Sequence, residues 1–251
     1  LKYMVKEKIE TKGLFHEKLK QGWSELNRWQ EDWETLKKKV EEAKTSWLLG
    51  KLYKSFDSKK GVNERPKELT VIATDGSQIF PDHHEISSCY LINTGYVVIH
   101  YGTKEKPLMS QEAVLYYRDD DLFEQFNGRK VSVNTSIISA RRGISELEKL
   151  TLLLLENSKK KHLLGLVDGT IILWTLEGSA PDFKDKILKS FITYMDKLRD
   201  KKIPVASYMS RPRTNDFSNS LRVGLCPERK VNCDTCPYKE QLFLPCSPVE
   251  G

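Results

Sequence analysis

The sequence predicts an α/β protein in which helices pack against a mixed β-sheet. Three observations indicate this class. Short apolar runs that are typical of buried strands begin at Leu69 and at Leu163. The early runs follow one another directly, which favours antiparallel pairing. The later runs alternate with long segments of helical periodicity, which favours parallel pairing in the same sheet.

Residues 1–57 form a charged region with helical periodicity and no proline. Apolar side chains recur there at three- and four-residue steps and make a narrow stripe. Such a helix is expected to pack on its own domain or on a second copy of the chain, rather than to bind a ligand. Residues 58–68 contain Gly, Asn and Pro and are expected to be a linker. The stripe consists of Trp23, Leu26, Trp29 (or Gln30), Trp33, Leu36 and Val40.

Residues 69–222 are expected to hold the sheet. The tripeptide Asn-Thr-Gly at 93–95 is typical of a tight hairpin between two strands. Thr135 or Ser136 can cap the first long helix of this region. The elements expected in order are strands at 69–74, 86–93 and 96–102, a helix at 135–157, a strand at 163–167, a helix at 182–202 and a strand after Pro204.

Two of the apolar runs end on an aspartate and a glycine, at Asp75 and at Asp168. If these strands are neighbours, the two carboxylates lie close together, and this is stable only with a shared proton or a cation. Oxygen ligands favour Mg²⁺ or Mn²⁺, which suit phosphoryl transfer. The alternative is that each aspartate is an ordinary turn or capping residue.

A third acid lies on the helix expected at 135–157, which must pack on the sheet. Glu146 borders the apolar face of this helix and can reach a strand end, but Glu148 borders it as well. Helical phase alone does not separate the two, and most helical glutamates are solvated surface residues.

This order of elements, with acids on the first strand, the first helix and the fourth strand, resembles the ribonuclease H-like nucleases. Four sequence blocks resemble the NurA family of DNA-end-processing nucleases more closely, from about Leu69 to Cys246. They are ATDGSQIFPDHHE (73–85), CYLINTGYVVIHYG (89–102), LVDGTIILWTLEG (166–178) and SYMSRPRTNDFSNSLR (207–222).

The resemblance implies a ribonuclease H-like fold and a metal-dependent nuclease. It implies a manganese-dependent 5′-to-3′ exonuclease that also cuts single strands, and that works as a homodimer with a HerA-type hexameric ATPase in double-strand-break end resection. Asp75 and Asp168 match the acids that ligate Mn²⁺ (or Mg²⁺) in that family. Glu146, four residues after Arg142, matches the helix acid beside them.

The sequence departs from the family pattern at its end. Family members continue well beyond the cysteine block, and a late acid or histidine helps to complete their site. The chain is therefore expected to be truncated. This favours an alternative function: a catalytically incomplete DNA-binding adaptor that docks a motor ATPase through the tryptophan-bearing N-terminal helix.

Arginine and hydroxyl side chains near the expected strand ends suit contacts with DNA phosphates. The alternative is a solvated loop after Tyr208. His83 and His84 follow Asp75 closely and suit a metal or proton-transfer role, although an exposed loop is favoured there. The candidates for DNA binding are Arg141, Arg142, Ser210, Arg211 and Arg213, with Arg222 further along.

Residues 223–251 form a cysteine-rich segment with the spacing C-x6-C-x2-C-x9-C, at Cys226, Cys233, Cys236 and Cys246. Four thiolates at such spacing indicate structural Zn²⁺ or an iron–sulfur cluster. Unligated thiols are the alternative. The fifth cysteine, Cys89, falls in an expected strand and is assigned to the core.

Composition sets the remaining expectations. A formal charge of +6 suits an anionic partner such as DNA without requiring one. No apolar run approaches the roughly 20 residues that a membrane-spanning helix needs. The first residues lack the apolar core of a secretory signal, so a cytoplasmic location is expected.

Overall fold

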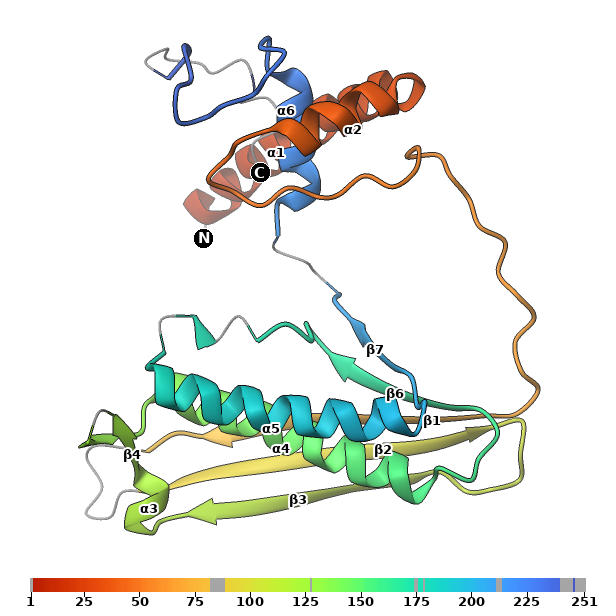
Figure 1. Cartoon of the computed structure of the whole chain (residues 1–251), viewed down its shortest axis with the longest axis vertical. Coiled ribbons are helices and arrows are strands. Elements are labelled where there is room, and N and C mark those ends of the chain that lie inside the picture. Colours follow the sequence, from red (N-terminus) through yellow and green to blue (C-terminus); the bar gives the residue numbers. More distant parts are fainter. Residues whose placement is uncertain are drawn as a thin grey trace. The chain divides into compact units, whose positions relative to one another are not determined.

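The computed structural model describes residues 2–81, 89–126, 128–173, 176–177, 179–210, 214–239 and 246 (Figure 1). The chain forms two compact units. The sheet unit comprises residues 64–211, and the terminal unit combines residues 1–63 with residues 212–251. The sequence predicted three consecutive segments instead, with residues 212–222 in the sheet region.

The sheet unit contains a five-stranded mixed sheet in the order β3-β2-β1-β6-β7. Strands β1, β2 and β3 pair antiparallel, whereas β6 and β7 continue the sheet from β1 in parallel. This confirms the predicted mixed sheet with an antiparallel start. The strands are β1 (Leu69–Ile79), β2 (Tyr90–Tyr101), β3 (Leu108–Tyr116), β6 (Leu163–Asp168) and β7 (Val205–Tyr208).

The hairpin predicted at residues 93–95 is wrong. Thr94 lies inside β2, where it pairs with Gly76 of β1 on one side and with Glu112 of β3 on the other. Ladders on both sides satisfy the backbone and hold the tripeptide extended, and they override its local turn preference. The third antiparallel strand is β3, which the sequence did not reveal. Residues 86–88 of the expected second strand lie outside the described residues.

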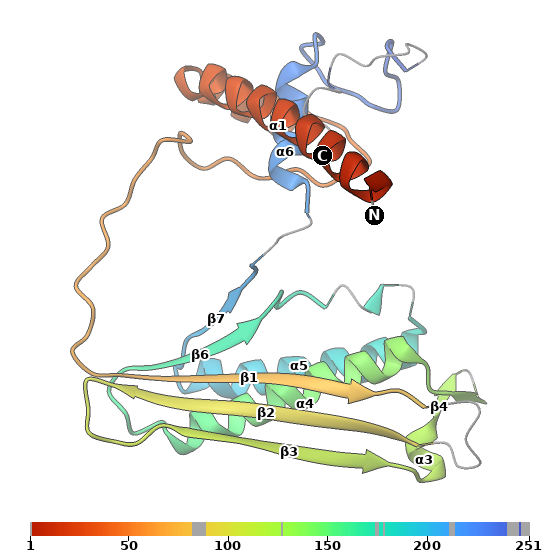
Figure 2. The same ribbon diagram turned by 180° about the vertical axis from the view of Figure 1, so that it is seen from behind.

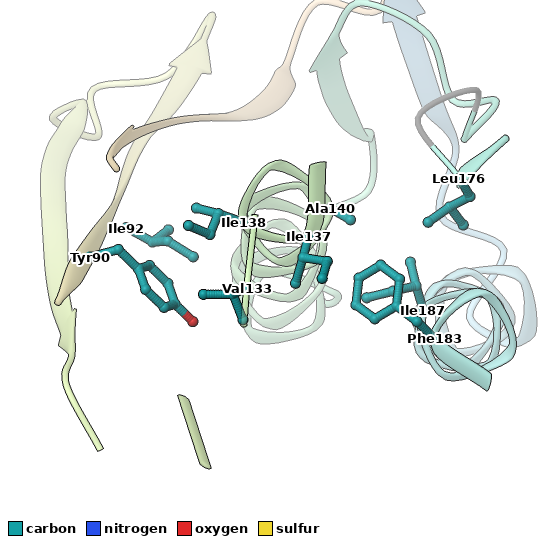
Figure 3. Close-up of a cluster of buried hydrophobic side chains, with 9 residues drawn as sticks. All are labelled: Tyr90, Ile92, Val133, Ile137, Ile138, Ala140, Leu176, Phe183 and Ile187. Carbon is teal, nitrogen blue, oxygen red and sulfur yellow. The ribbon is translucent and has the colours of Figure 1, made fainter. Parts of the chain in front are cut away.

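Helices α4 (Thr135–Glu156) and α5 (Pro181–Asp200) lie against one face of the sheet (Figure 2). Both were predicted within a few residues. The cap of α4 differs, because the Asn134 side chain accepts the hydrogen bond from the Ile137 backbone N–H, 3.0 Å away. One apolar cluster joins β2, α4 and α5 through Tyr90, Ile92, Val133, Ile137, Ile138, Ala140, Leu176, Phe183 and Ile187 (Figure 3).

A second cluster fixes α4 on β1 and β6. Ile72, Leu150 and Leu154 are fully buried in it. Burial of side chains of this size stabilises the fold by roughly 1.5–3 kcal/mol each. The contact sets the height and rotation of α4 over β1, and with them the position of its acidic residues.

A polar corner links β3 to α4. It contains the short helix α3 (Asp119–Leu122) and a two-stranded sheet of β4 (Phe123–Phe126) and β5 (Arg129–Ser132). Glu124 of β4 is buried and pairs with Arg141 of α4, with 2.6 Å between Oε1 and Nη2. This pair fastens the corner to the helix.

The terminal unit contains α1 (Lys2–Glu31), α2 (Trp33–Glu42) and α6 (Asp216–Leu225). Leu36 and Val40 of the predicted stripe are buried there, and Trp29 packs against the same core. The expectation that the stripe packs on its own domain is confirmed for these residues, whereas Trp23 is 63% exposed. The remaining core residues are Leu52, Leu221, Val223 and Val231.

Helix α6 corrects the interpretation of residues 210–222 as a loop at the sheet edge. Its buried residues Leu221 and Val223 supply part of the core of the terminal unit. None of the helices that the structure describes is both long and apolar enough to cross a membrane.

Candidate active site

Each of the two aspartates comes directly after one member of a residue pair that joins two neighbouring strands. Thr74 of β1 is in register with Val167 of β6 in the parallel ladder, and Asp75 and Asp168 are the next residues. Asp168 ends β6, as predicted. Asp75 does not end its strand, because β1 continues to Ile79 and Asp75 pairs with Gly95 of β2.

Asp75 and Asp168 line one pocket on the sheet, with a volume of about 720 Å³. Both residues are exposed. Because side chains alternate along a strand, Asp75 points away from the face that carries Thr74 and Gly76, on which α4 packs. The pocket is also lined by Ala73, Val97, Met109, Gln111, Leu166 and Tyr208.

Glu146 approaches β1 from the helix side. The Thr74 hydroxyl donates a hydrogen bond to the Glu146 backbone carbonyl over 3.0 Å. The side-chain Oε1 of Glu146 is buried and lies 3.1 Å from Nε of Arg142 as an ion pair. The backbone N–H of Gly76 also faces this carboxyl group and lowers its pKa. A metal ion at this carboxylate oxygen would therefore compete with the ion pair to Arg142.

Gly76 makes this approach possible. A Cβ atom at Gly76 would lie 2.5 Å from Glu146 Oε1 and 2.9 Å from Cγ of Arg142. Only glycine therefore lets both side chains of α4 lie against β1 at this height. The glycine of the Asp-Gly-Ser block was visible in the sequence, but the helix that it accommodates was not.

The structure separates Glu146 from Glu148. Glu148 is exposed and forms a hydrogen bond with Tyr194 of α5. Burial and this carboxylate together raise the pKa of Tyr194 to about 12. Glu148 thus faces the neighbouring helix, whereas Glu146 lies against β1 and lines a pocket with Asp168.

The electrostatic environment of Glu146 links the three acids. Burial raises the pKa of its carboxyl group, and the carboxylates of Asp75 and Asp168 raise it further. Arg142 opposes this effect, but the pKa remains above the ordinary value. Burial is the main cause of this shift, and a bound divalent cation would relieve the smaller part that comes from repulsion by the two aspartates.

The three acids offer the type of ligand atom that a divalent metal ion needs, but their side chains are not gathered around one point. Asp168 lines the pocket of Asp75 and also a second pocket of about 180 Å³, which contains Glu146. Carboxylate oxygens are the donors that Mg²⁺ and Mn²⁺ prefer. In the parts of the chain described, no three His, Cys, Asp or Glu side chains are gathered into a ready ligand set.

The Glu146→Gln variant is expected to melt at a higher temperature than the parent chain at neutral pH. Folding raises the pKa of Glu146, so this carboxyl favours the folded state only while it is protonated. That contribution is complete below the ordinary value of 4.5 and is lost as the pH rises through the folded-state pKa. Glutamine stays neutral throughout, so the advantage of the variant should appear as the pH rises.

Thermal midpoints measured between about pH 4 and pH 8 test this expectation. Glu156→Gln is the matched control, since Glu156 is exposed on the last turn of the same helix. A Glu146→Gln midpoint that stays at or below the parent value at every pH would show that the ion pair with Arg142 outweighs burial.

The structure describes only some of the residues that were predicted to bind DNA. Arg141 is 17% exposed and is bound by Glu124 and by the Tyr90 hydroxyl, so its contacts in the structure are internal. Arg142 pairs with Glu146 and donates to Gln78 Oε1 at 2.8 Å. Ser210 is exposed after β7. Arg211, Arg213, His83 and His84 lie outside the described residues.

Arg222 is on α6 in the terminal unit, with its guanidinium 4.6 Å from the centre of the Trp47 ring. It is therefore part of a helix and not of the phosphate-binding loop expected between 210 and 222.

The four clustered cysteines line one pocket of about 380 Å³ in the terminal unit. All are free thiols and half-buried. Burial raises the pKa of Cys233, and the other three cysteines raise it further, so the four sulfurs interact. Cys89 lies in the sheet unit, directly before β2.

The order of strands in this sheet and its helical cover define a mixed α/β protein. The model of the NurA domain family matches residues 69–243. The chain belongs to the NurA family, and this membership supports a nuclease role.

Among solved structures, two resemble this chain at low sequence identity. The NurA nuclease from Sulfolobus solfataricus is 13% identical, with a TM-score of 0.41, and the match covers 89% of this chain and 67% of that one. A type 1 ribonuclease H with the type 2 active-site motif is 9% identical, with a TM-score of 0.32, over 60% and 66% of the two chains. No curated protein sequence matches the chain.

Proposed function

We propose that the chain is a divalent-metal-dependent DNA nuclease that hydrolyses phosphodiester bonds. The observation that carries this proposal is the pair Asp75 and Asp168, which follow the in-register residues Thr74 and Val167 on neighbouring parallel strands. Glu146 lies across β1 from Asp75, with a buried carboxylate oxygen. Two aspartates on neighbouring strands, with a glutamate on the helix that packs on β1, suit phosphoryl transfer better than a turn or capping role.

Each acid has a proposed role. Asp75 and Asp168 hold Mn²⁺ or Mg²⁺, and Glu146 either joins them as a ligand or orients the attacking water. When bound, the ion lowers the pKa of a water molecule and neutralises charge on the leaving oxygen. Because the pKa of Glu146 is raised, this carboxylate is also suited to accept a proton from that water. Arg142 positions Glu146 through their ion pair.

The finer assignment follows the family. We propose a 5′-to-3′ exonuclease that also cuts single strands and acts in the cytoplasm on broken DNA ends, during end resection in double-strand-break repair. Its proposed partners are DNA, a HerA-type hexameric ATPase and a second copy of the chain. The net charge of +6 supports binding of DNA. This chain spans 67% of the solved NurA nuclease, so these features are proposed for the whole protein.

Cleavage of end-labelled DNA tests the proposal. Duplex and single-stranded substrates carrying a label at the 5′ or the 3′ end are incubated with Mn²⁺, with Mg²⁺ or with EDTA. The expected result is metal-dependent release of short products from the 5′ label, while the 3′-labelled strand shortens gradually. A chain that binds DNA but cleaves neither substrate with either metal would support the adaptor function instead. Cleavage that persists in EDTA would contradict the metal site.

A further inference from the structure

The terminal unit contains a second group of potential metal ligands, separate from the acids of the sheet unit. We propose that Cys226, Cys233, Cys236 and Cys246 form a tetrathiolate metal centre that fastens the segment after α6 to the helices at the start of the chain. This centre is structural, and its existence does not depend on the nuclease function.

The sulfurs already share one pocket. All four cysteines line the same cavity of about 380 Å³, and none of them is in a disulfide. In the described part of the chain they are not drawn into a closed ligand set, so the ion itself would complete the arrangement. Thiolates are soft ligands that select Zn²⁺ or iron–sulfur clusters, and four cysteines satisfy either.

The backbone holds the first two cysteines close to the N-terminal helices. Cys226 caps the end of α6. The N–H of Cys233 donates to the carbonyl of Lys44 at 2.9 Å, and the N–H of Lys44 donates to the carbonyl of Val231 at 2.8 Å. Lys44 also forms an isolated parallel bridge with Asn232. The chain just after α2 therefore positions the loop that carries Cys233.

Two cations are placed to compensate the negative charge of the centre. Four thiolates around Zn²⁺ carry a net charge of −2. Lys39 of α2 donates to the carbonyls of Gly224 and Cys226, and its ammonium group lies near the Cys226 sulfur. Nη2 of Arg222 lies 4.0 Å from Sγ of Cys246, within reach of an N–H···S contact. Donors of this kind stabilise metal-bound thiolates.

Packing shows what the centre would stabilise. Cys226 and Cys233 contact the apolar core that contains Leu36, Val40 and Leu52. This core is small, and small cores commonly depend on a metal or on disulfides for their stability. The absence of disulfides among the described residues leaves a metal ion as the available cross-link.

Metal analysis of the purified full chain tests the proposal. The expected result is about one Zn²⁺ per chain, or iron and sulfide with the visible absorption of a cluster. The Cys233→Ser variant should lose this metal, and Cys89→Ser, which changes the cysteine of the sheet unit, should keep it. Unchanged metal content in Cys233→Ser, or metal far below one per chain in the parent, would overturn the proposal.

A second measurement covers the case in which Cys233→Ser fails to fold. Titration of the parent chain with a mercurial thiol reagent should release the metal in step with the reaction of four thiols. Lys39→Met should retain the fold but release its metal at a lower concentration of a competing chelator than the parent. Release of metal that is independent of thiol modification would assign the ion to another site and contradict the tetrathiolate centre.

Discussion

The Asp75→Asn and Asp168→Asn variants are each expected to cleave DNA at least about a thousandfold more slowly than the parent chain. A catalytic metal ion contributes several kcal/mol of transition-state stabilisation, and each 1.36 kcal/mol is a factor of ten in rate. Both carboxylates are exposed, so the thermal midpoint should change little, as is usual for surface substitutions.

Initial cleavage rates with Mn²⁺, measured beside thermal midpoints, check this expectation. Asp185→Asn is the matched control, because Asp185 is an exposed aspartate on α5 of the same unit. Mn²⁺ should also raise the thermal midpoint of the parent chain and of the control, but not that of Asp75→Asn. Variants that unfold, or that cleave at the parent rate, would show that the aspartates are turn or capping residues.

The Gly76→Ala variant is expected to lose most of its activity without any change in a charged residue. The added methyl group would lie 2.5 Å from Glu146 Oε1 and 2.9 Å from Cγ of Arg142, so both side chains must move. A displacement of about 1 Å at a catalytic group can cost roughly a hundredfold in rate. Overpacking of this kind also costs about 1–3 kcal/mol of stability.

Gly143→Ala provides the contrast. Gly143 lies on α4, one residue after Arg142, and nothing lies within 4 Å of a Cβ atom built there. Alanine should stabilise this helix by up to about 1 kcal/mol and leave the cleavage rate unchanged. If Gly76→Ala matches the parent in rate and in thermal midpoint, the close contact between Glu146 and β1 is not needed for catalysis.

The helices and strands that could be predicted are those in which the spacing of apolar residues shows which side is buried. Helix α4 and strand β6 are long or strongly apolar, so each indicates its packing face without knowledge of its partners. The turn predicted at residues 93–95 was wrong because pairing on both sides of β2 overrides the local turn preference of Asn-Thr-Gly. Strand β3 was missed because its residues are mostly exposed at the edge of the sheet and show no clear alternation.

Some residues of the candidate site could also be predicted from the sequence, and others could not. Asp75 and Asp168 could be located because each follows an apolar run and precedes a glycine. The choice between Glu146 and Glu148 required the rotation of α4, which Leu150 and Leu154 set by packing against the sheet. The internal ion pair of Arg141 with Glu124 could not be predicted either, because the two residues are 17 positions apart and lie on different elements, α4 and β4.

The terminal unit is built from two segments that are far apart in the sequence, and this affects how the protein folds during translation. Its core needs Leu36 and Val40 from the beginning of the chain and Leu221 and Val223 from near the end. The sheet unit lies entirely between them in sequence and emerges first as a complete set of elements. The apolar stripe of the early helices therefore stays uncovered until α6 has been synthesised after the sheet unit, which makes these helices a natural target for chaperones during translation.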